Sequence, residues 1–359
     1  MTNPTSQIID KFLESQNRLV TQSSDLSLES IASMVENEAI DVSPGYQRRE
    51  RWSNIKESAL IESFLLNIPV PPIYLAEDEY GRYTVIDGKQ RVSAIHKFLK
   101  RNLKLKNLQR FFELENYSFD ELPPQLKNAI SIRPYLRVVT LLNQSDPNLK
   151  YEVFTRLNTG GDNLLPQEVR NVAFRGPLND LIYHLSENDF LRRQLKIINK
   201  SEKPYKQMVD AEYVLRFFTL RDLWYNFPGN MNVAMNLYMD RNRIIDETEI
   251  TRLNNIFLTT INYCKDIWGD NAFMRFDGDQ HRKLILQGFY DVQMVPISLI
   301  VDKGIILTND QKQAIRNAFV LKYETDASFQ DSIRQFTSNS ERVKYRIGTM
   351  NALIYKIVN

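Results

Sequence analysis

Cysteine is almost absent from this chain of 359 residues, in which Cys264 is the only one. A single cysteine excludes disulfides within the chain and zinc sites built on cysteine. No apolar run approaches the length of a membrane span, and the first residues, MTNPTSQIID, lack the basic and apolar regions of a secretory signal. We therefore expect a cytoplasmic protein with no membrane partner.

A strong charge of either sign is also lacking. The sequence has 46 Lys and Arg against 44 Asp and Glu, which gives a net charge of +2. No overall basic field therefore demands nucleic acid or an anionic membrane, so any basic site must be local. Hydrophobic residues make up 43% of the chain, which is enough for two domains with cores of their own.

The pattern of the chain changes near residue 175. Before that point, helical periodicity alternates with extended stretches. The prolines of IPVPPIYLAE (68–77) exclude a helix interior, and Gly81 marks the turn of a strand pair. YLRVVTLL (135–142) is the last convincing strand. Beyond it, long periodic segments with almost no Gly or Pro predict helices.

We therefore predict an α+β protein in three parts. Residues 1–24 form an N-terminal helical extension, residues 25–175 a small mixed α/β domain, and residues 176–359 an all-helical domain. The functional motifs fall in the second part.

The stretch VIDGKQRVSAIHKFL (85–99) joins a strand to a helix and carries an acid, a glycine and two cations at the junction. A helix that begins there presents free N–H groups and the positive end of its dipole. Gly88 allows close approach to a ligand, and Lys89 and Arg91 add charge, so the junction suits a phosphate. Asp87 could hold magnesium or orient Arg91. An ordinary turn, with surface cations and Asp87 as N-cap, fits these residues as well.

The stretch YQRRERW lies upstream, after a Pro-Gly turn, and places three arginines and an aromatic ring within six residues. Arginine matches phosphate with two hydrogen bonds, and Tyr46 could stack on a base. The alternative is a solvated basic loop that Trp52 anchors to the core.

The stretch FTRLNTGGDNLLPQEVRN lies downstream and combines a glycine-containing loop with a helix start at Pro166. Glu168 could pair with an arginine of the site and fix its rotamer. The alternative is helix capping with a surface ion pair, worth under about 1 kcal/mol.

The order of these stretches, with IPVPPIYL between the first two, resembles the N-terminal domain family of GmrSD-type restriction endonucleases over roughly residues 25–175. This family is placed in the ParB/sulfiredoxin-like superfamily. The resemblance implies a ParB-like α/β fold that binds, and in studied relatives hydrolyses, a nucleoside triphosphate, with magnesium as a candidate cofactor. It does not distinguish GTP, ATP and CTP. The usual role is prokaryotic defence against foreign DNA.

The resemblance also assigns residues to the site. Catalysis falls to Gln47, Asp87, Gln90 and Arg91; nucleotide binding to Tyr46, Gln47, Arg48, Gly88, Lys89, Gln90, Arg91, Arg156 and Asn158; support to Glu168, Arg170 and Asn171; and a magnesium ion to Asp87. The family motif is Asp-Gly-Gln-Gln-Arg, whereas this chain has Lys89 at the third position. Lysine still binds phosphate as a point charge, so the departure puts hydrolysis in question rather than binding.

Many relatives carry an HNH nuclease domain, which needs histidines close to other metal ligands. The three histidines of this chain, His96, His184 and His281, are isolated in the sequence, and no HNH arrangement is recognisable. We therefore expect the partners to be a nucleotide, DNA and a separate nuclease or effector subunit, with the oligomeric state open.

Two other functions stay open at this point. Asp87-x-Lys89, with Glu77 or Asp78 on the preceding strand, matches the metal site of an autonomous nuclease. A non-catalytic module, in which a bound nucleotide only switches shape or partner affinity, is the other alternative.

Overall fold

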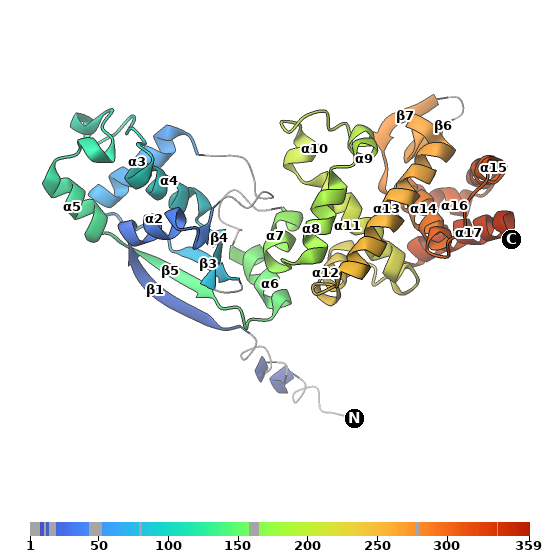
Figure 1. Ribbon diagram of the computed structural model, residues 1–359, viewed down its shortest axis with the longest axis horizontal. Coiled ribbons are helices and arrows are strands. Elements are labelled where there is room, and N and C mark those ends of the chain that lie inside the picture. Colours follow the sequence, from blue (N-terminus) through green and yellow to red (C-terminus); the bar gives the residue numbers. More distant parts are fainter. Residues whose placement is uncertain are drawn as a thin grey trace. The chain divides into compact units, whose positions relative to one another are not determined.

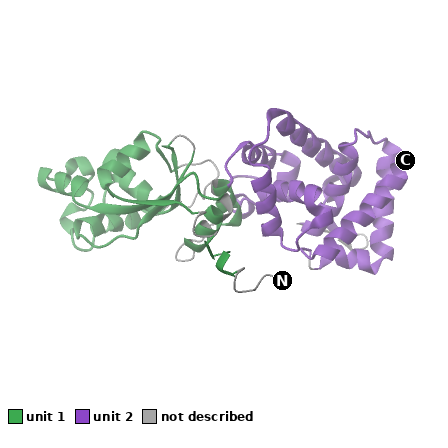
Figure 2. Ribbon diagram, turned by 90° about the horizontal axis from the view of Figure 1, so that it is seen from below, with its two compact units in different colours: residues 1–173 green, residues 174–359 purple. Residues whose placement is uncertain are grey.

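The computed structural model describes residues 8–10, 12–13, 19–42, 52–78, 81–157, 165–277, 280–335 and 337–359. The chain forms two compact units, Met1–Ala173 and Phe174–Asn359 (Figure 2). A five-stranded sheet belongs to the first unit and the second is mainly helical, which confirms the predicted α+β class. None of the described helices combines the length and apolar character that crossing a membrane requires.

Unit 1 is built on a mixed sheet. Its strands are β1 (Thr21–Ser27), β2 (Ile40–Asp41), β3 (Ile73–Glu77), β4 (Tyr83–Asp87) and β5 (Tyr135–Leu141), in the order β1-β5-β3-β4-β2 (Figure 1). Strand β3 is antiparallel to β4 and parallel to β5, so it joins the two halves of the sheet.

Strand β1 starts at Thr21, inside the range that we assigned to a helical extension. Its sequence, TQSSDLS, is polar and mostly exposed, so it shows no apolar alternation that would predict a strand. Antiparallel pairing with β5 along all seven residues places it in the sheet instead. The stretch LSLESIASMVE predicts a helix with Ser27 as its N-cap, and α2 (Leu28–Glu36) confirms this, because the Ser27 hydroxyl accepts from the Ser30 N–H.

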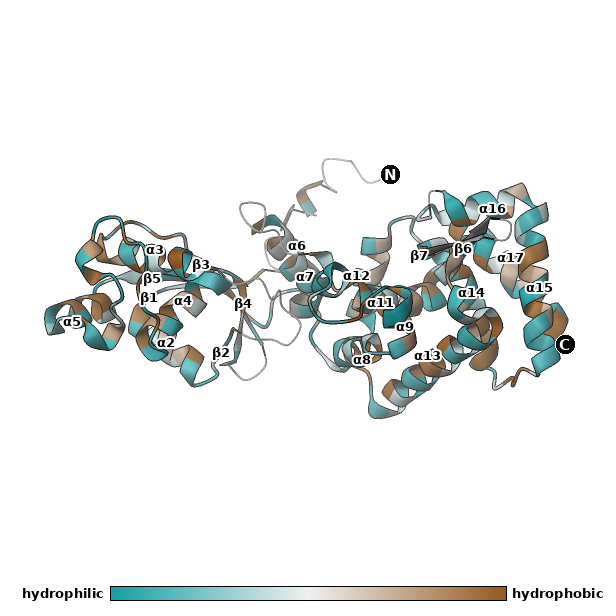
Figure 3. Cartoon of the chain, turned by 90° about the horizontal axis from the view of Figure 1, so that it is seen from above, coloured by the Kyte–Doolittle hydropathy of each residue, from teal (hydrophilic) through white to brown (hydrophobic). Residues whose placement is uncertain are grey.

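Helices cover the sheet of unit 1. They are α2 (Leu28–Glu36), α3 (Asn54–Leu65), α4 (Lys89–Lys100), α5 (Pro124–Ile132), α6 (Pro147–Leu157) and α7 (Pro166–Ala173), with the short turns η2 (Phe112–Leu114) and η3 (Phe119–Glu121). Helices α2, α3 and α4 bury Ile31, Ile61 and Ile95 in one core with strand residues Ile73 and Val85. Hydrophilic and hydrophobic residues alternate along these helices (Figure 3), as expected where one face of a helix packs on a core.

Glu62 of α3 holds the loop that follows α4. This carboxylate is 6% exposed and accepts the backbone N–H groups of Gln109, Arg110 and Phe111 at 3.1, 2.6 and 3.1 Å. Burial acts to raise the pKa of Glu62, but the three N–H donors and the charge of Arg110 outweigh it, and the pKa is lowered. The charged form therefore stabilises the fold.

Unit 2 is a helical assembly with one exception. Its helices are α8 (Pro177–Ser186), α9 (Asp189–Gln194), α10 (Lys203–Lys206), α11 (Val209–Leu223), α12 (Met231–Arg241), α13 (Glu247–Trp268), α14 (Gln287–Val301), α15 (Asn309–Thr325), α16 (Ala327–Arg334) and α17 (Ser340–Val358), with the turns η5 (Trp224–Asn226) and η6 (Gly269–Asn271). The exception is the antiparallel pair β6 (Met274–Asp277) and β7 (Gln280–Ile285). It departs from the all-helical prediction because two short, polar strands give little periodicity to read.

Three buried charges tie the central helices of unit 2 together. Asp291 of α14 accepts from Arg216 of α11 at 2.6 and 2.7 Å and from Arg346 of α17 at 2.5 Å. All three side chains are at most 3% exposed. Arg346 also donates to the carbonyl oxygens of Ser332, in α16, and of Thr337, just after it. The carboxylate of Asp291 thus joins three helices, and Arg346 ties α16 to them.

Asp291→Asn should destabilise unit 2 by about 3–5 kcal/mol, because it leaves two buried guanidinium groups without a counter-charge. Urea unfolding followed by circular dichroism measures the loss. Asp266→Asn is the control, since Asp266 is half-exposed in a single pair with Lys312 and should cost under about 1 kcal/mol. Equal losses in the two variants would contradict the role given to the cluster.

Glu62→Gln should cost about 1–3 kcal/mol of unfolding free energy at pH 7, because an amide oxygen cannot replace a carboxylate that accepts three N–H groups. A lowered folded-state pKa stabilises the fold above the ordinary value of 4.5 and stops doing so as the pH falls below it. The difference between wild type and variant should therefore shrink in acid. Glu113→Gln, at an exposed position of η2, should show neither effect.

Candidate functional site

The candidate site lies where β4 ends at Asp87 and α4 begins at Lys89. Gly88 between them has φ +92°, in the left-handed region that favours glycine. A Cβ at this position would lie 2.5 Å from Ile73 Cγ2 and 3.0 Å from Arg91 Nη2. Glycine is therefore required both by the backbone conformation and by the space.

Asp87 orients Arg91, which is one of the two roles that we considered for it. Arg91 Nη2 donates to Asp87 Oδ2 at 2.7 Å and to the carbonyl oxygen of Pro72 at 3.1 Å. Asp87 does not cap the helix as the alternative reading required, because Gly88 is the N-cap and no side chain bonds there. The guanidinium of Arg91, on the first turn of α4, is thus held by Asp87 at the end of β4 and by Pro72 just before β3.

The charges of this first turn oppose the helix dipole. Helix α4 carries Lys89 and Arg91 there and no acid. A first-turn acid is present in α2, α3, α13, α15 and α17, whereas α5, α10, α12, α14 and α16 also lack one. A cation at the N-terminal end is unfavourable by about 0.3–1 kcal/mol. Such a local conflict is typical of a functional position.

Trp52, the residue that follows YQRRER in the sequence, contacts the junction. Gln90 Oε1 accepts the backbone N–H of Trp52 at 3.0 Å, and the Trp52 ring packs against the core. Tyr46, Gln47 and Arg48 themselves lie outside the described residues. The anchoring of Trp52 that we considered is therefore confirmed, and it is made partly by the motif residue Gln90.

Of the downstream residues assigned to nucleotide binding, Arg156 lies on the exposed face of α6, where its side chain is 77% exposed and pairs with Glu152. Asn158 lies outside the described residues. The structure thus brings Gly88, Lys89, Gln90 and Arg91 together in one turn.

The polar side chains of helix α7 are buried. The alternative for this helix was capping with an ion pair on the surface. Glu168, Arg170 and Asn171 have no exposed surface, so the surface alternative is wrong. Glu168 Oε2 accepts the Leu165 N–H at 2.7 Å and thereby caps its own helix.

Gln167 belongs to the same buried set and was missed in the sequence. Its amide accepts from Arg170 Nη1 at 3.2 Å and donates to Asn171 Oδ1 at 3.4 Å. The spacing of three and four residues on one helix was a usable signal. Val169 of α7 packs with Ile86, the residue before Asp87, so the helix lies against the strand that leads to the junction.

The second carboxylate of a nuclease site is not at this end of the sheet. In the β3–β4 register, Tyr74 faces Asp87 whereas Glu77 faces Tyr83, which puts Glu77 three residues, or roughly 10 Å, further along β3. Glu77 accepts the Asn143 N–H, and Asp78 accepts the Thr84 hydroxyl. Neither acid therefore completes a metal pair with Asp87.

A resident metal finds little support among the described residues, where no three His, Cys, Asp or Glu side chains are grouped. His96 pairs with Glu36 at 2.7 Å, and His184 lies on α8 of the other unit. Asp87 offers one carboxylate whose Oδ2 is taken by Arg91. That suits only an ion held chiefly by phosphate oxygens, as magnesium is in nucleotide sites.

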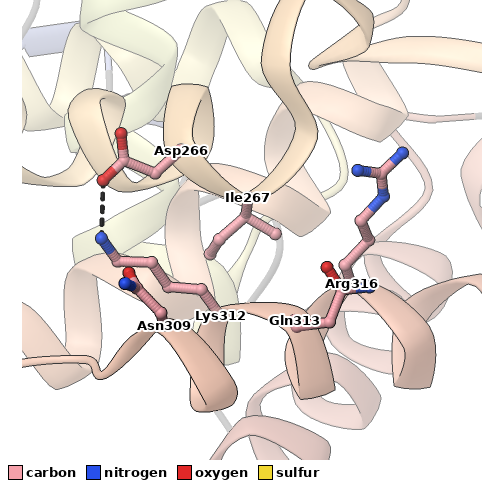
Figure 4. A pocket seen from close by; sticks show the side chains of 6 residues that line it. All are labelled: Asp266, Ile267, Asn309, Lys312, Gln313 and Arg316. Carbon is pink, nitrogen blue, oxygen red and sulfur yellow. Dashed lines mark hydrogen bonds and ion pairs between the residues drawn. The ribbon is translucent and has the colours of Figure 1, made fainter.

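A separate pocket of about 420 Å³ lies between α13 and α15 in unit 2. It is lined by Asp266, Ile267, Asn309, Lys312, Gln313 and Arg316 (Figure 4). Lys312 closes one end by pairing with Asp266 at 2.7 Å. No residue of the motifs contributes to this pocket, so it is not part of the candidate site.

A family model places these motifs in a known context. Residues 31–175 match the GmrSD restriction endonuclease N-terminal domain, a range that contains the β4–α4 junction and α7. No curated protein and no solved structure matches the chain. Residues 31–175 are therefore similar to GmrSD restriction endonuclease N-terminal domains, and this similarity covers less than half of the chain.

Proposed function

We propose that unit 1 binds a nucleoside triphosphate at the β4–α4 junction and serves as the nucleotide-dependent component of a restriction-type defence system. The observation that carries this proposal is the first turn of α4, which has two cations, a glycine N-cap and no side-chain cap. A polyphosphate would relieve the conflict between these cations and the helix dipole. The family supports the defence role, since its name refers to restriction endonucleases.

Each residue of the turn has a stated role in this proposal. Gly88 lets the chain turn into the helix in a left-handed conformation directly against Ile73, and Lys89 supplies a point charge. Arg91 is oriented by Asp87, and its buried Nε has no hydrogen-bond partner among the described residues. A phosphate oxygen at Nε would satisfy this donor, which otherwise carries an energetic penalty. Tyr46, Gln47 and Arg48 complete the site by resemblance to the family.

Hydrolysis is the finer part of the proposal. In it, Gln47 and Gln90 position the attacking water, and Asp87 contributes one carboxylate to a magnesium ion that arrives with the nucleotide. Glu168, Arg170 and Asn171 support the site from α7.

Two observations favour a non-catalytic switch as the second candidate. Lys89 replaces the usual glutamine, and Gln90 Oε1 is engaged by the Trp52 N–H. In that case nucleotide binding alone would change affinity for a nuclease or effector subunit. Thermal-shift measurements with GTP, ATP and CTP, each with and without magnesium, test the common step, because a ligand that binds the folded state raises its Tm.

Arg91→Ala should weaken binding of the nucleotide that gives a thermal shift by about 1.5–3 kcal/mol, the range for a charge-assisted hydrogen bond. Calorimetric titration measures the affinity. Arg101→Ala is the matched control, because Arg101 is the C-cap of the same helix and its side chain is 63% exposed. A folded Arg91→Ala protein with wild-type affinity would refute the proposed site.

Lys89→Gln restores the family motif and separates the two candidates. If the site hydrolyses nucleotide, phosphate release should be kept or increased, with an affinity loss of roughly 0.5–1.5 kcal/mol from the lost charge. If the module only binds, neither protein should release phosphate and only the affinity should change. DNA nicking is measured alongside with magnesium present. Cleavage by the wild type that disappears in Lys89→Gln would contradict both candidates and favour an autonomous nuclease.

A further inference from the structure

The segment between α9 and α10 of unit 2 concentrates positive charge. Residues 193–206, called here the basic turn, carry five cations and one carboxylate, Glu202, in a chain whose net charge is only +2. The cations are Arg193, Lys196, Lys200, Lys203 and Lys206. The basic turn lies outside the range that matches the family model, so nothing about the motif residues accounts for it.

These five cations face solvent. All of them are exposed, and none takes part in an ion pair among the described residues. Cations of unit 1 such as Lys97, Lys100 and Arg137 are instead paired with acids. Arg193 lies 5.8 Å over the ring of Phe190, so it is the charge of the four lysines that is not used to hold the fold together among the described residues.

Arg192, which directly precedes the basic turn, is a cation that does hold the fold together. Arg192 lies 5.4 Å over the Tyr205 ring and pairs with Asp210 at 3.4 Å and with Glu187 at 3.6 Å. It thereby fixes α10 to α9, which Figure 1 shows at one edge of unit 2. The backbone is fixed too, since the Ile197 N–H bonds to the Arg192 carbonyl oxygen at 2.8 Å. The exposed cations are thus presented on a folded turn rather than on a loose tail.

We propose that the basic turn binds the phosphate backbone of duplex DNA without reading its sequence. Four of its five cations are lysines, which meet phosphates as point charges and release counterions. Asn199 and Ser201 add exposed neutral hydrogen-bonding groups of the kind that contact DNA phosphates and sugars. The choice of DNA over other polyanions rests on the restriction-type role proposed above. The charge arrangement itself does not depend on nucleotide binding by unit 1.

The test is fluorescence anisotropy of a labelled duplex of about 30 base pairs with the full chain, titrated between about 50 and 200 mM salt. The variant replaces three lysines at once: Lys196→Gln, Lys200→Gln and Lys203→Gln. At the lower salt concentration it should bind about tenfold or more weakly than wild type. The slope of log K against log salt should fall by about two to three, close to 0.9 per lost phosphate contact. Wild type that does not bind the duplex at low salt would overturn the proposal.

A charge-matched control separates a site from general electrostatics. Lys265→Gln, Arg316→Gln and Lys344→Gln remove the same charge from exposed positions elsewhere in unit 2 and should leave affinity within about twofold. Equal losses in the two triple variants would overturn the proposal. The proposal would also be overturned if the protein bound anionic lipid vesicles through the same lysines and did not bind the DNA duplex. Thermal melting of both variants verifies folding.

Nucleotide thermal shifts on the same proteins keep the two proposals apart. Wild type that binds the duplex through the basic turn but no nucleotide would uphold this inference and refute the nucleotide site. Wild type that binds nucleotide but not the duplex would refute this inference alone.

Discussion

The contact between Gly88 and Ile73 is the constraint on which the candidate site depends. The backbone of Gly88 lies so close to the Ile73 side chain that no Cβ fits between them. This contact sets the start of α4 against the start of β3. From that position Arg91 Nη2 donates to Asp87, the last residue of β4, and to the carbonyl oxygen of Pro72, just before β3. Both hydrogens of Nη2 are thus donated within the protein, and they hold the guanidinium in a fixed orientation.

The protein buries charge in two different ways. In unit 2, Asp291 bonds to both Arg216 and Arg346, and Arg346 also donates to the carbonyl oxygens of Ser332 and Thr337. That cluster joins helices, although the buried Nε of Arg346 has no hydrogen-bond partner among the described residues. At the junction in unit 1, the buried Nε of Arg91 likewise has no hydrogen-bond partner among the described residues, but Arg91 lies at the start of a helix whose N-cap is a glycine. An unpartnered Nε is therefore common to both places, and what distinguishes the junction is the pair of cations, Lys89 and Arg91, at a helix N-terminus.

The sequence predicted the elements whose signals are local. The Ser27 cap, the Gly81 turn between β3 and β4, and the strand that becomes a helix at Gly88 all follow from residues close together in the chain. Strand β1 could not be predicted in this way, because its polar residues are placed by β5, more than a hundred residues later. The register that separates Glu77 from Asp87 and the burial of Gln167 on α7 are likewise set by tertiary packing. The DGKQR motif indicated which residues form the junction, but it did not predict which residues from other strands and helices would contact them.

The pairing of a cation decides what kind of ligand it can select. Arg91 is held by two oxygens and can accept only an anion that approaches from one direction, so it suits a defined group such as a nucleotide phosphate. Lys196, Lys200 and Lys203 of the basic turn have no such restraint on their ends, and their long side chains can adjust to phosphates at varied positions. On these two proposals, a chain with almost balanced charge would carry a specific anion site in unit 1 and a nonspecific polyanion surface in unit 2. The difference comes from how the cations are held rather than from how many there are.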